Sequence, residues 1–223
     1  MSLFQKITSS TEARINKEIL TGFIRQQDKK GVRKTHLFGG RYENIYLDTN
    51  HIPQLKALMD EAVAHAEQIL NVKGLRAGYW FNDMPPGSST TLHTHVDDDV
   101  LLSAVYYVYV PEDSGNLIIY DDSFNGDDAK IEIQSRTGDF IFFKPDIRHE
   151  VSKNKSAEHR LIEPLQVRPF LFVLMSSDYE NFNETDYMAQ KLNGWRHRRP
   201  ALKSFLPDER TTVADAPHRR VFR

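Results

Sequence analysis

Two short segments carry the side chains best suited to hold a metal ion. The first places His93, His95 and Asp97 at alternate positions, and the second places His149 after an apolar run. Alternate side chains of an extended strand point to the same side, so all three in the first segment would share one face. Two imidazoles and one carboxylate on one side of an ion suit a non-haem iron(II) centre with open coordination positions. The spacing predicts a metal centre of His95, Asp97 and His149.

The composition limits the chemistry around such a centre. The 223 residues include no cysteine, which excludes thiolate ligands, disulfides and a thiol nucleophile. Lys plus Arg number 29 and Asp plus Glu 31, so the net charge of −2 indicates no nucleic-acid partner. The first residues lack an apolar leader, and the longest apolar run, residues 100–110, is too short to cross a membrane. We therefore expect a cytoplasmic protein without a membrane partner.

The pattern of apolar residues predicts helices before a β-core. Helical spacing predicts helices over 11–26 and 53–71. From residue 74 onward the apolar runs are short, rich in aromatic and β-branched residues, and separated by turn residues. The expected strands are 78–82, 90–95, 101–110, 116–120, 129–134, 138–144, 148–152 and 168–175. Strands without intervening helices indicate a mainly β fold, an antiparallel sandwich or barrel with N-terminal helices.

We expect one catalytic domain over 1–177, followed by a polar and then basic extension over 178–223. The last part, residues 195–223, has eight Lys plus Arg against three acidic residues. Its Arg196, Arg198 and Arg199 follow Trp195, a grouping that suits an acidic partner. A solvated terminus without a partner explains the same charges, and both interpretations stay open.

Several motifs of the β-core occur in a characteristic order. They are Trp80-Phe81-Asn82, His93-Thr94-His95, residues 102–108, Ser114-Gly115-Asn116-Leu117, residues 138–145 and His149-Glu150-Val151. In this order they resemble the putative 2-oxoglutarate and iron(II)-dependent oxygenases, in the prolyl-hydroxylase-like branch. The resemblance extends over 78–175. It implies a double-stranded β-helix, a jelly-roll or cupin-like barrel, that uses iron(II), 2-oxoglutarate and O2.

The same resemblance implies a reaction and a binding site for the cosubstrate. The expected reaction hydroxylates an unactivated C–H bond of a small-molecule, amino-acid or peptide substrate, with release of succinate and CO2. An arginine on a late strand would bind the distal carboxylate of 2-oxoglutarate. The family spacing selects Arg160, but Pro164 should break the strand that Arg160 begins, whereas Arg168 begins a more apolar strand. Both arginines are predicted, with a preference for Arg160.

Two alternatives concern the metal ligands. Relatives in the resembled branch have the motif His-x-His-Pro where this chain has His93-Thr94-His95-Val96, so His93 and His95 could form the metal pair. We favour His95 and Asp97 because iron chemistry calls for a carboxylate ligand. A cupin would instead use His93, His95, Asp99 and His149, since Gly87, the two histidines and Asp99 match its first motif apart from Asp for Glu. A third possibility is a β-barrel binding module without enzymatic activity.

Overall fold

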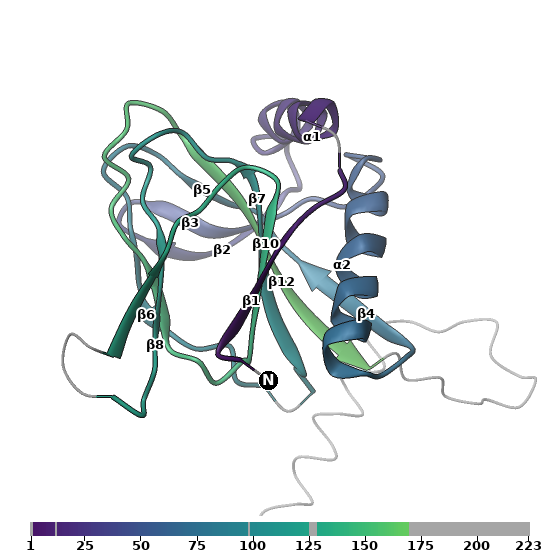
Figure 1. Cartoon of the computed structure of the whole chain (residues 1–223). Coiled ribbons are helices and arrows are strands. Elements are labelled where there is room, and N and C mark those ends of the chain that lie inside the picture. Colours follow the sequence, from purple (N-terminus) through teal and green to yellow (C-terminus); the bar gives the residue numbers. More distant parts are fainter. Residues whose placement is uncertain (1, 12, 98, 125–128, 170–223) are drawn as a thin grey trace, which may run out of the picture. The chain divides into compact units, whose positions relative to one another are not determined.

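The computed structural model describes residues 2–11, 13–97, 99–124 and 129–169, all within one compact unit that spans 1–171. Figure 1 shows α1 (Ala13–Gln26) above the β-core and α2 (Leu55–Leu70) beside it. No helix in these ranges is long and apolar enough to cross a bilayer. The expected extension 178–223 and its basic part 195–223 lie outside the described residues, so the division at residue 177 stays a prediction.

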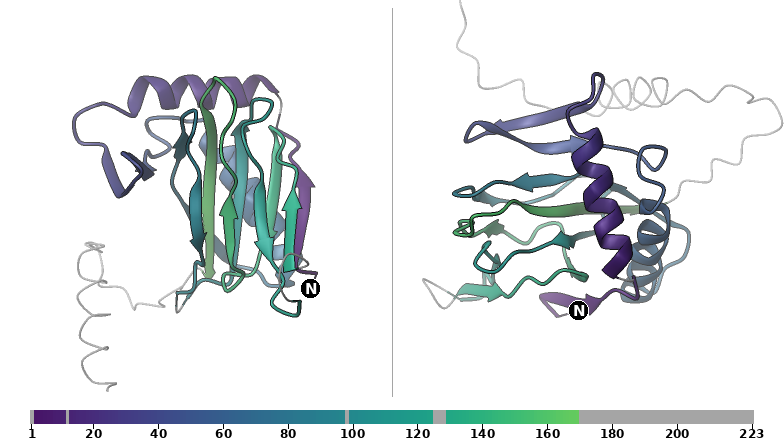
Figure 2. Two further views of the ribbon diagram at one scale, coloured as in Figure 1. Left: turned by 90° about the vertical axis from the view of Figure 1, so that its left-hand side faces the viewer. Right: turned by 90° about the horizontal axis from the view of Figure 1, so that it is seen from above.

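The β-core consists of two antiparallel sheets (Figures 1 and 2). The larger sheet has the order β1 (Phe4–Thr8), β10 (Asp139–Phe143), β7 (Leu102–Tyr109), β12 (Arg160–Pro169) and β4 (Leu75–Tyr79), with β5 (Asn82–Met84) also paired to β12. The smaller sheet has the order β6 (Thr90–His93), β11 (His149–Val151), β8 (Leu117–Tyr120) and β9 (Lys130–Ile133). A separate hairpin joins β2 (Arg33–Phe38) to β3 (Arg41–Tyr46).

Two apolar cores hold these layers together. The first lies between the larger sheet and the helices α1 (Ala13–Gln26) and α2 (Leu55–Leu70), and it includes Ile19, Phe23 and Tyr106. The second lies between the two sheets and includes Tyr107 and Ile119. Adjacent residues of β7 thus enter different cores, as the alternation of side chains along a strand requires. A strand buried on both faces explains why β7 is apolar along its whole length.

The mainly β fold with N-terminal helices is confirmed, and the two helices lie close to their predicted ranges. Strands β1, β2 and β3 were not predicted, and the single strand expected over 78–82 is divided between β4 and β5. The strands of the β2–β3 hairpin are mostly exposed or half-buried, so the chain needs no apolar alternation there. The rule that detects half-buried strands therefore gives no signal for this hairpin.

The last described strand differs from the prediction. Residues 168–175 were expected to form it, but β12 runs from Arg160 to Pro169 and passes through Pro164; residues 170–175 lie outside the described residues. The carbonyl of Pro164 accepts a hydrogen bond from the amide of Trp80 at 3.3 Å. The nitrogen of Pro164 points to the same side of β12 as its carbonyl, toward the gap where β4 ends at Tyr79 and β5 begins at Asn82. A proline fits at this break because no regular ladder bond needs its missing N–H.

Gly115 occupies a turn that only glycine fits. Its φ of +89° lies in the left-handed region, and an added Cβ would collide with the carbonyl oxygen of Ser152. We expect Gly115→Ala to lower the free energy of unfolding by about 2 kcal/mol or more, since strain and overpacking act together. Urea unfolding measures this loss. Gly78→Ala is the control because an added Cβ there meets no atom within 4 Å; equal losses in both variants would contradict the argument.

Candidate metal centre

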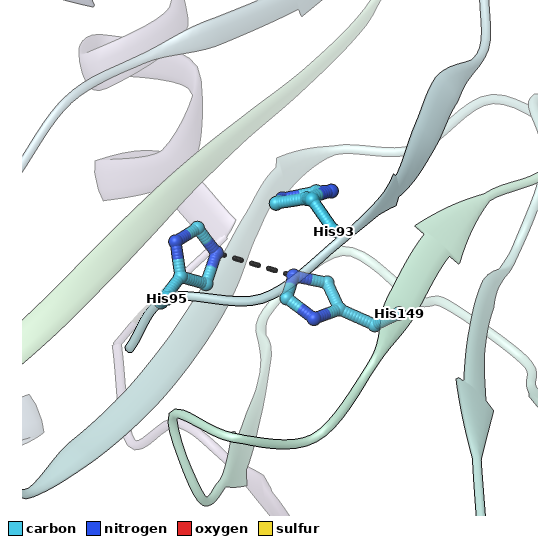
Figure 3. Close-up of side chains that lie close together, drawn as sticks. All are labelled: His93, His95 and His149. Carbon is cyan, nitrogen blue, oxygen red and sulfur yellow. Dashed lines mark hydrogen bonds between the residues drawn. The ribbon is translucent and has the colours of Figure 1, made fainter. Parts of the chain in front are cut away.

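Three imidazoles lie together at one end of the smaller sheet (Figure 3). His93 ends β6 and His149 begins β11, and the two residues are register partners in the antiparallel pair. His95 lies two residues beyond β6, where its amide donates to the carbonyl of Pro145 at 2.9 Å. One nitrogen of each ring lies within 4.8 Å of the others, and the Nε2 atoms of His95 and His149 are 3.1 Å apart. This spacing allows all three to contact one ion.

Backbone carbonyls orient two of the rings. Nδ1 of His149 lies 2.9 Å from the carbonyl oxygen of Ile147, and Nδ1 of His93 lies 2.7 Å from that of Thr91. A carbonyl oxygen only accepts hydrogen bonds, so each Nδ1 carries the proton and donates. The lone pair of each ring then resides on Nε2. Such a bond fixes the tautomer and orientation that a metal-ligating histidine needs.

The surroundings keep the rings of His95 and His149 neutral. Burial, together with the neighbouring His149 and His93, lowers the pKa of His95 to about 3. Burial likewise lowers the pKa of His149 to about 4, with a contribution from His93 in the same direction. The neutral imidazole is the form that binds metals. His95 and His149 therefore present unprotonated nitrogens at neutral pH.

Aromatic side chains border the imidazoles on two sides. The ring of Phe143 meets that of His149 edge-on, with centroids 4.7 Å apart. The half-buried ring of Trp80 lies 5.8 Å from that of His95. Aromatic neighbours lower the local dielectric and exclude water from a reacting centre. Neither side chain offers a metal ligand, so both shape the site rather than bind the ion.

The predicted carboxylate ligand lies elsewhere. Oδ2 of Asp97 is 3.2 Å from a guanidinium nitrogen of Arg168, and Asp97 is outside the group of residues whose ligand atoms converge. Strand β6 was expected to reach residue 95 but ends at His93, so the alternation that would direct Asp97 inward does not continue. His93 joins His95 and His149 instead, and its alternate position before His95 was the signal in the sequence. Asp97 as a ligand stays an untested prediction.

Asp99, the carboxylate of the cupin alternative, also pairs with Arg168. It is likewise outside the three-imidazole group found in the described part of the chain. The arrangement that a cupin would use, three histidines with Asp99, is therefore not assembled here. This observation weighs against the cupin interpretation.

The two predicted arginines lie at opposite ends of β12. They are eight residues apart, which in an extended strand is about 26 Å, and the even spacing places both on one face. Arg160 is fully buried, with a guanidinium that donates to the carbonyl of Gly115 at 2.7 Å and to Oγ of Ser135 at 2.9 Å. Arg168 instead binds Asp97 and Asp99, which follow His95 by two and four residues. The structure thus gives the two side chains different surroundings.

Arg160 has the properties of a carboxylate-binding group. Within the described residues, no carboxylate pairs with it and its Nε has no hydrogen-bond partner. The guanidinium carbon lies 5.2 Å from the ring centroid of Tyr107, and burial lowers the pKa of Arg160. An arginine nevertheless remains protonated in a protein. A buried cation without a counter-charge fits the carboxylate of a small acid such as 2-oxoglutarate.

Residues 78–163 match a family model described as "Putative 2OG-Fe(II) oxygenase". This segment is similar to the 2OG-Fe(II) oxygenases. It contains the three imidazoles and Arg160, so the match covers the site as well as the strands around it. The predicted resemblance to the oxygenases is confirmed. No curated protein matches the chain.

Solved structures of oxygenases share the fold. A prolyl-4-hydroxylase from Pseudomonas putida is 20% identical, with 75% of this chain and 85% of that one covered and a TM-score of 0.53. The α-ketoglutarate-dependent epimerase SnoN of nogalamycin biosynthesis is 15% identical, with 75% and 78% covered and a TM-score of 0.60. A Trichoplax adhaerens prolyl hydroxylase bound to a hypoxia-inducible-factor peptide is 14% identical, with 75% and 84% covered and a TM-score of 0.59.

These similarities confirm the double-stranded β-helix fold expected from the oxygenase resemblance. The cofactors expected from the resemblance, iron(II), 2-oxoglutarate and O2, are those of the matched family, and one SnoN structure holds Fe3+ and α-ketoglutarate. The imidazole nitrogens and the unpaired buried Arg160 suit such a metal and cosubstrate. The oxygenase neighbours include an epimerase and a carbocyclase, so the fold alone leaves the outcome of the reaction open.

Proposed function

We propose that this chain is an iron(II)- and 2-oxoglutarate-dependent dioxygenase that hydroxylates an unactivated C–H bond. The observation that carries the proposal is the combination of three converging imidazoles with a buried, carboxylate-free arginine on the same barrel. A metal site alone would suit many binding proteins. An additional buried cation provides the second contact that a bidentate keto acid with a distal carboxylate requires.

His95 and His149 are the proposed central ligands of the iron. His93 is the third donor that the geometry favours, and Asp97 is the third donor that the sequence favours. Iron(II) with 2-oxoglutarate supplies the oxidising chemistry, in which O2 is consumed and succinate and CO2 are released. The protein orients the rings of His93 and His149 through the carbonyls of Thr91 and Ile147.

Arg160 is the proposed partner of the distal carboxylate of 2-oxoglutarate. The carbonyl of Gly115 and the hydroxyl of Ser135 fix its planar fork before the cosubstrate binds. Pre-organisation reduces the entropy that binding costs. The rings of Phe143 and Trp80 shield the adjacent imidazoles from water.

The proposed substrate is a small molecule, an amino acid or a peptide. The neighbours support this range, since one is a prolyl hydroxylase bound to a peptide and another an epimerase of nogalamycin biosynthesis. The cytoplasmic location expected from the sequence, and an acidic partner for residues 195–223, remain predictions.

An anaerobic titration tests the proposed function. Metal-free protein receives one equivalent of iron(II) and then increasing 2-oxoglutarate, and the visible absorption of the iron–keto-acid complex is followed. We expect a band that saturates with one equivalent of 2-oxoglutarate. Stoichiometric iron without this band would contradict the proposal. Succinate release in air, with ascorbate present, provides the catalytic check.

The same titration tests Arg160. We expect Arg160→Lys to weaken binding of 2-oxoglutarate by about tenfold or more, because hydrogen bonds to charged groups contribute about 1.5–3 kcal/mol and lysine cannot reproduce the planar fork. Iron binding should be unchanged. Circular dichroism and thermal unfolding verify that the variant folds, since Arg160 is fully buried. A weaker complex in Arg168→Lys, with Arg160→Lys unaffected, would assign the carboxylate to the other predicted arginine.

A further inference from the structure

The segment that connects β6 to β7 carries one of the three imidazoles outside regular secondary structure. His93 and His149 are held by strand pairing, but His95 follows the end of β6. A ligand outside a strand depends on other contacts for its orientation. The contacts that fix residues 95–101 therefore decide how well the centre is pre-organised.

Backbone bonds hold both ends of this segment. The amide of His95 donates to Pro145, and the amide of Leu101 donates to the carbonyl of Val167 on β12 at 2.9 Å. A turn closes between them, where the amide of Val100 donates to the carbonyl of Asp97 at 3.2 Å. The backbone thus attaches the segment to β12 only at Leu101, six residues after His95.

Arg168 supplies the contacts in the middle. Its guanidinium donates to the carboxylates of Asp97 and Asp99 and to Oε1 of Gln166, the last at 2.6 Å. The Arg168 side chain is 20% exposed, whereas that of Asp97 is 52% exposed. A single exposed ion pair contributes little, but a planar fork that joins two carboxylates is stronger and directional. Gln166, two residues earlier on β12, orients the fork toward the segment.

We propose that Arg168 is a positioning residue of the metal centre: it fixes the segment after His95 through Asp97 and Asp99 and so holds the His95 imidazole in ligating position. This inference rests on the proposed function. It separates the two arginines of β12, with Arg160 at the cosubstrate and Arg168 behind a metal ligand. It also gives Asp97 a role that does not require contact with the ion.

Metal affinity provides the test. Arg168→Met and Arg168→Lys are titrated with cobalt(II), followed by the visible absorption of the bound ion. Loss of a residue that supports a metal ligand typically weakens metal binding by about 10–100-fold. We therefore expect cobalt(II) affinity to fall about tenfold in Arg168→Met. The loss should be smaller in Arg168→Lys, which keeps the positive charge. Binding of 2-oxoglutarate to the cobalt-saturated protein should change less than twofold.

Fluorescence gives a second readout at the same place. The chain has two tryptophans, and Trp195→Phe leaves only Trp80, whose ring lies 5.8 Å from that of His95. Cobalt(II) should quench Trp80 in this background, with a midpoint that shifts in parallel with the absorption when Arg168 is replaced. Arg41→Met is the matched control, because Arg41 is also partly buried and binds several acceptors, including Asn82 and Glu43.

The possible outcomes are distinct. Unchanged cobalt affinity in Arg168→Met, or an equal loss in Arg41→Met, would overturn the positioning role. Tighter binding in Arg168→Met would also overturn it, because it would mean that the freed Asp97 binds the ion. Wild-type protein that binds neither cobalt(II) nor 2-oxoglutarate would instead refute the proposed function.

Discussion

Replacing His149 with alanine is expected to abolish stable metal binding. This residue is 4% exposed, and it is the imidazole that pairs in register with His93 and lies 3.1 Å from His95 at the ring nitrogens. Its removal leaves two donors, and a divalent ion then loses one of its few protein ligands. We expect cobalt(II) or iron(II) affinity to fall by about a hundredfold or more, with complete loss of 2-oxoglutarate turnover. Metal content after equilibrium dialysis measures the loss.

A histidine outside the cluster provides the control. His159 is exposed and pairs with Asp83 rather than with the imidazoles, so His159→Ala should retain metal and activity. Thermal unfolding of both variants in the absence of metal shows whether folding is intact. A His149→Ala protein that still binds one equivalent of iron with wild-type affinity would contradict the assigned centre.

The identity of the third ligand follows from two further variants. If His93 binds the ion, His93→Ala should lose affinity to about the same extent as His95→Ala, and Asp97→Ala should lose only the contribution of the Arg168 contact. If Asp97 binds the ion, as the sequence predicts, the order of the two effects reverses. The structure favours the first outcome because Asp97 contacts Arg168 and lies outside the convergent group.

Glu163→Gln is expected to stabilise the protein in alkaline solution. Glu163 lies on β12 and is fully buried, and among the described residues neither oxygen has a hydrogen-bond partner. Burial raises its pKa to about 8. The titratable groups that interact with it, Tyr79 on β4 and Tyr106 on β7, are phenols whose own pKa values are also raised by burial. Glu163 is therefore a neutral carboxylic acid at neutral pH.

The sign of the pH dependence follows from the two states of the chain. Unfolding returns Glu163 to its ordinary pKa, 4.5, below the folded value of about 8. The neutral acid thus favours the folded state fully below pH 4.5, and this contribution is lost as pH rises through about 8. Each pH unit in this window lowers the free energy of unfolding by up to about 1.4 kcal/mol, so the whole loss is on the order of 5 kcal/mol.

Urea unfolding at about pH 5, 7 and 9 measures this effect as the difference between the variant and the wild type. The difference should grow with pH in favour of Glu163→Gln, because the amide cannot ionise. Glu132→Gln, at an exposed position of β9, is the control and should show no such trend. A constant difference between Glu163→Gln and wild type across the range would show that Glu163 keeps its ordinary pKa in the folded protein.

The sequence was sufficient for the class of fold, and it singled out two of the three imidazoles that lie together. Helical spacing identified α1 and α2, and short apolar runs identified β7 and β10, because each of these elements buries an apolar face. His95 and His149 were predicted as ligands, and the structure brings them together. The inferences about the fold succeed because periodicity reports burial. The role of the two histidines as ligands stays a prediction.

The sequence was not sufficient where the end of a strand decides the outcome. Asp97 was expected to share a face with His95, but β6 ends before either residue. Pro164 suggested a strand break, but the break is in the neighbouring strand, which a single segment of sequence does not reveal. Both candidates for the carboxylate-binding residue, Arg160 and Arg168, are arginines, so residue type does not distinguish them. Their partners, Ser135 for one and Asp99 for the other, come from distant segments that only the folded chain brings together.

The three imidazoles are held in place by different kinds of contact, and this difference determines which residues around them can change. His93 and His149 are fixed by hydrogen bonding between β6 and β11, so changes there would disturb the sheet. Residues 96, 97, 99 and 100 lie outside the strands, and the side chains of Asp97 and Asp99 attach this part of the chain to Arg168. Mutations at these positions can therefore alter the rim of the proposed metal centre while His93 and His149 stay in place. If the proposed function holds, related chains can acquire new substrate preferences by this route without rebuilding the barrel.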